Sequence, residues 1–256
     1  MENGLISSSI LGISQGGSLS PILSNIYLDK FDKELEARGL RFVRYADDCN
    51  IFVKSDKAAD RVMKSVISWL ERKLFLKVSA TKTKIVRPTN SSFLGFTFWK
   101  DSKGWKCKPL DDRKEKLISK IKEVLKRGKA ASQPLSKVFK EINQIIMGWI
   151  NYFKIGNMKW FLEKLGKWLR HKVRVIIIKQ WKKPKTIYKN LVTLRKVTMA
   201  SNTDEEIFSA AHTRLGLYRQ CGLSTINYLL SPIILSTPNK KKGRPGLVNP
   251  LAYYLK

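Results

Sequence analysis

Apolar residues recur at helical spacing and then at strand spacing in the first hundred residues. A helix is predicted over residues 22–35. Its apolar positions are Ile22, Leu23, Ile26, Tyr27, Phe31 and Leu35. The segments RFVRYA and NIFVK follow, rich in aromatic and β-branched residues and separated by Asp47-Asp48. This pattern predicts a β-hairpin with the acidic pair at or near its tip.

A second amphipathic helix is predicted over residues 62–74, opened by Asp56 and Asp60, which suit the helix dipole. Strands are predicted at LFLKV, TKIV and SFLGFTFW, with a turn at Gly104-Trp105. Strands and helices in this order indicate an α+β domain, in which helices pack on one face of a small antiparallel sheet.

From about Pro109 the pattern becomes helical, and three amphipathic helices with short connections predict a small bundle. The first helix would be capped by Asp111 or Asp112 and the third by Asn157. The three apolar stripes are Leu117 to Leu125, Val138 to Phe153 and Phe161 to Ile176. A further helix is expected at Glu205 to Tyr218.

Charge changes this picture, because 50 Lys and Arg residues against 20 Asp and Glu residues give a net charge of +30. Residues 101–200 hold 27 basic and 7 acidic residues, whereas residues 1–100 hold 16 and 10. The bundle is therefore predicted to bind a polyanion through lysines on its outer faces, with nucleic acid as the expected partner. A generally lysine-rich, solvated surface is the alternative.

The predicted phosphate-binding side chains fall into three groups. The bundle supplies Lys116, Lys120, Lys122, Lys126, Lys179, Lys182 and Lys183. The tail KKKGRPG supplies Lys240, Lys241, Lys242 and Arg244, in a loop able to grip phosphate. Lys82 precedes the predicted strand TKIV, and Lys84 lies within it.

Other compositional features exclude several classes of protein. Cys49, Cys107 and Cys221 are odd in number and far apart, so neither a disulfide framework nor a zinc cluster is predicted. No apolar run approaches the length of a transmembrane helix, and the first ten residues do not resemble a signal peptide. We therefore expect a cytoplasmic protein without a membrane partner.

The Asp47-Asp48 pair carries the candidate chemistry. Two carboxylates at a hairpin tip suit Mg²⁺, which takes one or two protein carboxylates and completes its shell with water and substrate phosphate. The matching reaction is two-metal phosphoryl transfer. Most Asp-Asp pairs are only polar turns, so the pair needs its sequence context to indicate a catalytic role.

That context is FVRYADDCNIFV, preceded by GISQGGSLSPILSNIYL, and together these segments resemble the reverse-transcriptase palm of group II intron proteins. LKVSATKTKIV resembles the next palm motif, FLGFTF the primer-gripping strands and GWINYF the maturase thumb, or domain X. The resemblance covers about residues 4–180. It implies an RNA-directed DNA polymerase and intron maturase that uses Mg²⁺.

The resemblance also implies roles for particular residues. Gln15, Gly16 and Gly17 would line the nucleotide pocket, and Tyr45 would lie beside the primer end. Asp47 and Asp48 would bind Mg²⁺, and Asp47 is the first choice as a metal ligand. Lys82 or Lys84 would protonate the leaving pyrophosphate, although a solvated basic turn is an equal alternative. The implied partners are intron RNA, an RNA/DNA template-primer and dNTPs.

Two departures from the family are visible. Ser14 and Ser18 stand where the family typically has proline. The family also has fingers and an earlier palm strand with another metal-binding aspartate, and neither Asp29 nor Asp32 is expected to replace it. We therefore expect a chain truncated at its N-terminus, with little polymerase activity unless a separate N-terminal half is supplied.

The predicted fold class is α+β: a partial palm with a small antiparallel sheet and helices, followed by an all-α, three-helix thumb. The predicted domains are the palm at 1–108, the thumb at 109–184 and a basic, nucleic-acid-contacting C-terminal segment at 185–256. An alternative function is a non-catalytic, RNA-binding maturase module that assists intron splicing. A helical DNA-binding protein with an incidental acidic turn is a third.

Overall fold

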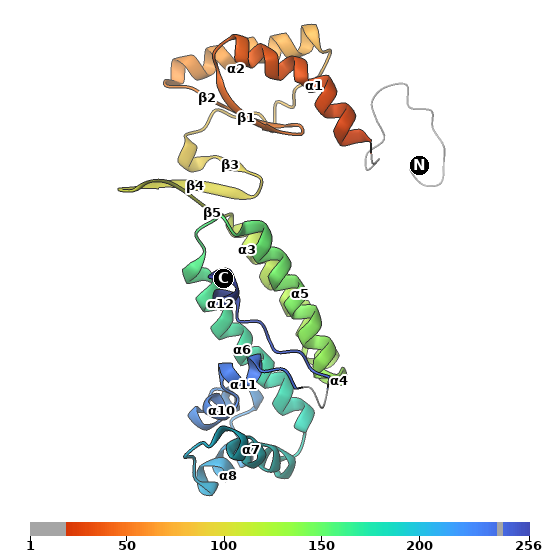
Figure 1. Cartoon of the computed structure of the whole chain (residues 1–256), viewed down its shortest axis with the longest axis vertical. Helices are drawn as coiled ribbons and strands as arrows, with labels where there is room; N and C mark the ends of the chain where they lie inside the picture. The colour runs from red at the N-terminus through yellow and green to blue at the C-terminus, as the bar shows by residue number, and fades with distance from the viewer. Residues whose placement is uncertain (1–18, 240–242) are drawn as a thin grey trace, which may run out of the picture. The chain divides into compact units, whose positions relative to one another are not determined.

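The computed structural model of the chain describes residues 19–239 and 243–256, and these form two compact units, divided between Phe93 and Leu94 (Figure 1). Both units combine helices with antiparallel strands, which confirms the predicted α+β class. No helix in the described part of the chain is long and apolar enough to cross a membrane.

The first unit packs two helices against one face of a hairpin. Its elements are α1 (Ser20–Ala37), β1 (Arg41–Tyr45), β2 (Asp48–Phe52), α2 (Asp56–Lys73), the 3-10 helix η1 (Pro88–Asn90) and β3 (Ser92–Phe93). Phe31 and Leu35 of α1, Val66 of α2 and the adjoining Leu74 form its buried core. Phe42, Cys49 and Ile51 pack against this core from the strands. The inward positions of the hairpin are therefore the alternate ones, as the strand period requires.

Within the described residues, the opposite face of the hairpin and several positions in the first half of α1 carry exposed apolar side chains. Val43, Tyr45 and Phe52 are exposed on the strands. Ile22 and Ile26 of α1 are exposed as well, although their helical spacing predicted one continuous buried stripe. The helix prediction is confirmed, but only the C-terminal half of the stripe reaches a core.

Two strand predictions are wrong. LFLKV and TKIV form no ladder with any described strand. Between them, Lys82 and Thr83 donate their backbone N–H groups to Ser79 O, at 3.2 and 3.0 Å, in a turn. Strand propensity measures how well a segment packs beside a partner strand, and these segments have none here.

The second unit begins with a hairpin and continues as helices. Its elements are β4 (Phe96–Asp101), β5 (Gly104–Pro109), α3 (Asp111–Val124), α4 (Arg127–Ser132), α5 (Leu135–Phe153), α6 (Lys159–Trp181), α7 (Pro184–Thr198), α8 (Asp204–His212), α9 (Leu217–Gln220), α10 (Ser224–Leu229), α11 (Pro232–Ser236) and α12 (Pro250–Tyr254). The β4–β5 turn lies at residues 102–103, just before the predicted position.

The three predicted bundle helices are present as α3, α5 and α6. Their inward residues, including Ile121, Ile146 and Leu169, are fully buried in one continuous core. The expected caps differ, because Asp111 and Asp112 lie inside the first turn of α3, and Met158 rather than Asn157 precedes α6. The predicted helix at 205–218 ends at His212, since a loop with Gly216 at φ +77° follows.

The C-terminal residues complete the bundle instead of forming a separate segment. Residues 244–249, which we call the strap, run beside α5 and lead into α12, which packs against both α5 and α6 (Figure 1). Asn143 of α5 donates Nδ2–H to Gly246 O at 2.7 Å and accepts from Val248 N at 2.9 Å. A Cβ at residue 246 would lie 1.8 Å from Ser236 O, so the strap requires glycine there.

A buried arginine fastens the same region to α6. Arg174 is 7% exposed and donates to Leu230 O at 3.0 Å and to Asn227 O at 3.3 Å. Residues 185–256 thus share the core of α3, α5 and α6. The boundary between compact units, at residue 93, assigns the β4–β5 hairpin to the helical unit. A compact unit need not coincide with a family domain, so the domain limits at 108 and 184 stay predictions.

We predict that Asn143→Ala lowers the free energy of unfolding by about 1–3 kcal/mol, because it leaves a partly buried carbonyl and N–H of the strap unpaired. Amide hydrogen exchange at Val248 should become faster, and urea unfolding should give the loss of stability. Gln144→Ala is the matched control, since Gln144 is exposed on the same helix. Equal effects of the two substitutions would show that the strap is not held by Asn143.

Candidate active site

The turn between β1 and β2 presents two adjacent carboxylates. Tyr45 pairs with Asp48 across the hairpin, so Ala46 and Asp47 form a two-residue turn. Asp47 lies in the turn and Asp48 begins β2, and both side chains are exposed. Within the described residues, neither carboxylate has a hydrogen-bond or ion-pair partner. The predicted position at the hairpin tip is confirmed.

Ala46 has an uncommon backbone conformation. Its φ is +52°, in the left-handed region that costs a residue with a Cβ about 1–2 kcal/mol. The Ala46 carbonyl accepts a hydrogen bond from Arg44 Nη1 at 2.8 Å. The turn is therefore held by a side chain as well as by the strand ladder.

Arg44 lies on the inward face of the hairpin, where it meets α1. Its Nε and Nη2 donate to the two carboxylate oxygens of Asp32 at 2.7 and 2.5 Å. Its Nη1 also donates to Asn25 Oδ1 at 3.0 Å. The hydrogen bond to Asp32 raises the pKa of Arg44. Asp32 is thus paired with an arginine, and Asp29 pairs with Lys33 at 2.6 Å. The expectation that neither aspartate replaces a palm ligand stays a prediction.

The carboxylates of Asp47 and Asp48 suit a divalent cation that also binds the phosphates of a substrate. In residues 19–239 and 243–256, no three His, Cys, Asp or Glu side chains gather to form a metal cluster. Mg²⁺ does not need such a cluster, because one or two carboxylates, water and substrate phosphates complete its shell. The exposed, unpaired carboxylates of Asp47 and Asp48 fit this mode of binding.

The other residues predicted for the palm are only partly covered by the structure. Gln15, Gly16 and Gly17 lie outside the described residues. Tyr45 is 64% exposed and shares the outward face with its cross-strand partner Asp48, beside the turn. Lys82 and Lys84 are exposed in the loop after α2, and their roles stay predictions.

The predicted lysines of α3 do not form one surface. Lys116 lies within 3.5 Å of the Asp112 carboxylate, and Lys120 lies one turn further along the same side. Lys122 lies about 200° around the helix from Lys120, at about 100° per residue. A single nucleic-acid strand cannot contact both sides of α3 at once.

Other basic residues meet where α4 packs against the end of α6. Gln180 Nε2 donates to Gln133 O at 2.7 Å and to Ala130 O at 3.3 Å, which joins the two helices. We call this region the basic end. Its members are Lys126, Arg127, Lys129, Lys179, Lys182 and Lys183. Four of them were predicted from the sequence, whereas Arg127 and Lys129 were not.

The C-terminal basic loop is described only at its edge. Lys240, Lys241 and Lys242 lie outside the described residues. Arg244 is not directed outward as a free cation, because its guanidinium lies 5.1 Å from the ring of Phe139 and donates weakly to Ile234 O and Thr237 O. Burial lowers the pKa of Arg244. Its geometry is that of a packing residue.

The tryptophans differ in exposure. Trp149 and Trp168 pack against the bundle core, as their positions on the helical stripes indicated. Trp160 is 70% exposed, and Lys164 Nζ lies 3.6 Å from the centre of its ring.

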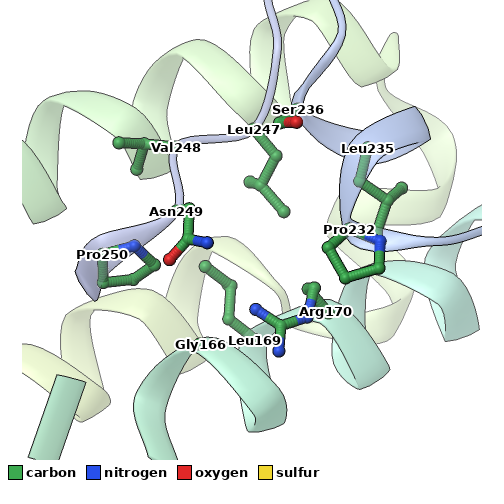
Figure 2. A pocket seen from close by; sticks show the side chains of 10 residues that line it. All are labelled: Gly166, Leu169, Arg170, Pro232, Leu235, Ser236, Leu247, Val248, Asn249 and Pro250. Atoms are coloured by element: carbon green, nitrogen blue, oxygen red, sulfur yellow. The ribbon is translucent and has the colours of Figure 1, made fainter. Parts of the chain in front are cut away.

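A small hollow lies under the strap, between α6 and α11. Figure 2 shows the side chains of Arg170 and Leu169 from α6 beside Leu235, Leu247 and Asn249. Burial lowers the pKa of Arg170. The lining contains no acidic residue and is mostly apolar, so we assign the hollow to the packing of the C-terminal residues.

Sequence reasoning missed the tie between Arg44 and Asp32. A signal for it exists, since strand alternation places Arg44 on the same face as Phe42, the face that packs on the helices. A charged residue at an inward strand position requires a partner. The sequence could thus have indicated that Arg44 is paired, although not with which acid.

Comparison with protein-family models gave two matches. Residues 6–98 match the family described as reverse transcriptase (RNA-dependent DNA polymerase). Residues 114–195 match the group II intron, maturase-specific domain. The search of curated proteins found no match.

We predict that the Cys49 thiol reacts slowly. Burial, and then the charge of Asp32, raise its pKa to about 11 from 9.0. At pH 8 the reactive thiolate is therefore roughly a hundredfold scarcer than in the unfolded chain. Iodoacetamide labelling followed by mass spectrometry should show this difference between native and urea-denatured protein. Similar native and denatured rates at Cys49 would contradict it.

Raised thiol pKa values also make stability depend on pH. Burial raises the pKa of Cys221 to about 12. Because both thiols lose their protons more readily in the unfolded state, their contribution to stability is full below about pH 9 and falls as pH rises towards 11.

Proposed function

Since this chain belongs to the family of group II intron-encoded reverse transcriptases and maturases, we propose that it is of the type that copies RNA into DNA by two-metal nucleotidyl transfer and binds intron RNA. The observation that supports this most is the Ala46–Asp47 turn, which presents two unpaired carboxylates within the reverse-transcriptase match.

Asp47 and Asp48 hold Mg²⁺ in this proposal, together with the phosphates of the primer terminus and the incoming dNTP. When bound, Mg²⁺ supplies Lewis-acid chemistry, lowering the pKa of the primer hydroxyl and balancing charge on the phosphates. The chain places these two carboxylates on the β1–β2 turn, where no described residue competes for them. The strand ladder and the hydrogen bond from Arg44 to Ala46 O hold the conformation of this turn. Tyr45 packs beside the primer end.

The basic end supplies the contact to RNA. Its cations come from α4, the end of α6 and the start of α7, and none of the six has an acidic partner in the described chain. Converging lysines and arginines of this kind bind the phosphate backbone through counterion release, without reading sequence. All six cations, and Gln180, which joins the two helices, lie within the maturase-specific match at residues 114–195.

A second candidate is an RNA-binding maturase module that assists splicing without polymerase chemistry. The distribution of charge favours it, because residues 101–200 carry 27 basic against 7 acidic residues and this region overlaps the maturase-specific match. This function needs the basic end and does not need Asp47.

Asp47→Ala separates the two candidates. With a separate N-terminal half supplied, primer extension on an RNA template with Mg²⁺ and dNTPs is expected to fall to background, because one of the two carboxylates proposed to hold Mg²⁺ is lost. RNA affinity and splicing assistance are expected to remain unchanged. Asp60→Ala, which removes an exposed carboxylate from α2, should affect neither. Loss of RNA binding in a folded Asp47→Ala chain would contradict this separation of roles.

RNA binding should weaken steeply with salt, and the basic end should account for much of the dependence. The triple variant Lys126→Gln, Lys129→Gln, Lys182→Gln is expected to reduce the slope of log K against log salt concentration by about 2–3, at about 0.7–0.9 per phosphate contact. Filter binding of an intron RNA over a salt series measures this slope.

The matched control is Lys154→Gln, Lys159→Gln, Lys164→Gln. It removes the same charge near the start of α6, about 30 Å from Lys179 along the helix at about 1.5 Å per residue. Its slope should change little. Equal losses for the two triple variants would indicate a diffuse field rather than an interface at the basic end.

A further inference from the structure

The guanidinium of Arg44 contacts three residues, two on helix α1 and one in the turn between β1 and β2. Within the described residues it donates four hydrogen bonds, to both Asp32 oxygens, to Asn25 Oδ1 and to Ala46 O. Its side chain is only 10% exposed. A bidentate arginine–carboxylate pair fixes distance and orientation together, which a lysine cannot do.

These contacts connect helix α1 to the conformation of the turn. Asp32 and Asn25 are both on α1, two turns of the helix apart. Ala46 is the first residue of the turn and holds the unfavourable positive φ. The same cation therefore sets where the turn lies relative to α1 and stabilises the backbone conformation from which Asp47 projects.

A purely stabilising role fits this arrangement poorly. A paired charge at a mostly buried position often contributes no more to stability than an apolar side chain of similar volume, because both ions lose hydration. The neighbouring inward positions Phe42 and Ile51 are apolar. An arginine at this place instead provides directed hydrogen bonds, and one of them ends on the turn itself.

We propose that Arg44 is a positioning residue for Asp47 and Asp48, with Asp32 and Asn25 as its anchors on α1. The inference rests on the proposed metal-binding role of the turn, and it assigns the geometry of that turn to a guanidinium outside it. Arg44 touches neither metal nor substrate and acts through the backbone of Ala46.

Mn²⁺ titration of the full chain tests this proposal. Paramagnetic broadening of the Asp47 and Asp48 amide signals reports binding at the turn, and Asp47→Ala should remove it. Arg44→Met is expected to weaken Mn²⁺ binding about tenfold, equivalent to about 1.4 kcal/mol. Arg44→Lys should restore little of the loss, because an ammonium cannot hold Asp32 and Ala46 in the same geometry.

Two further variants separate geometry from charge and from stability. Arg44→Met combined with Asp32→Asn leaves the net charge unchanged, and it should weaken Mn²⁺ binding as Arg44→Met does. Arg38→Met is the matched control, because Arg38 donates to Glu34 on α1 and to Ser65 on α2 and does not contact the turn. It should leave Mn²⁺ binding unchanged.

Amide hydrogen exchange along the β1–β2 ladder shows whether the hairpin persists. We expect the ladder amides to stay protected in Arg44→Met, while ¹⁵N relaxation reveals new motion confined to residues 46–48. If the ladder amides of Arg44→Met are not protected, the same measurements are made on Asn25→Ala. That substitution removes one hydrogen bond of Arg44 and leaves its ion pair with Asp32.

The outcomes distinguish the two proposals. Absence of Asp47-dependent broadening in the wild-type chain would overturn the metal-binding role, and ¹⁵N relaxation at residues 46–48 would still decide the role of Arg44. Unchanged Mn²⁺ binding and unchanged motion in a folded Arg44→Met chain would overturn the positioning role. Equal effects of Arg44→Met and Arg38→Met would overturn it as well.

Discussion

One mostly buried ion pair, between Arg44 on β1 and Asp32 on α1, fixes the orientation of the hairpin on that helix. The hairpin has two strands, and isolated two-stranded hairpins are marginally stable in water. Phe42 and Ile51 pack on the helices, but apolar contacts of this kind do not fix the orientation of the hairpin. The bidentate pair between Arg44 and Asp32, with hydrogen bonds of 2.7 and 2.5 Å, orients the hairpin on α1. The hydrogen bond from Arg44 to Ala46 O connects the same guanidinium to the acidic turn.

The second unit achieves order in a different way. One apolar core runs through α3, α5 and α6 and includes residues from α7 to α12. Polar side chains also bind the backbone of the C-terminal residues. Asn143 of α5 bonds to the strap, and Arg174 of α6 donates to the carbonyls of Asn227 and Leu230. Because the interior is aliphatic, the lysines occupy the outside. Helix geometry then decides which of them can contact the same polyanion.

The match to reverse transcriptases and the match to the maturase-specific domain fall on different kinds of structure. In the first, the two carboxylates of the acidic turn have no partner among the described residues. In the second, cations converge where α4 meets α6. Catalysis by metal ions needs exact placement of few groups, whereas binding of a phosphate backbone needs many charges placed loosely. The more directional hydrogen bonding at the acidic turn agrees with this difference.

Local spacing of residues was sufficient to predict the β1–β2 hairpin, the acidic pair at its tip and helices α1, α2, α3, α5 and α6. Each of these is specified by periodicity within one segment. Tertiary structure alone decided that LFLKV and TKIV form no strands, that Ile22 and Ile26 stay uncovered, and that Arg44 pairs with Asp32. It also decided that α4 packs against α6, which brings the segment that begins at Lys126 near the end of α6. The physical reason is that burial, strand pairing and ion pairing are made between segments far apart in sequence, and periodicity carries no information about which distant partner is present.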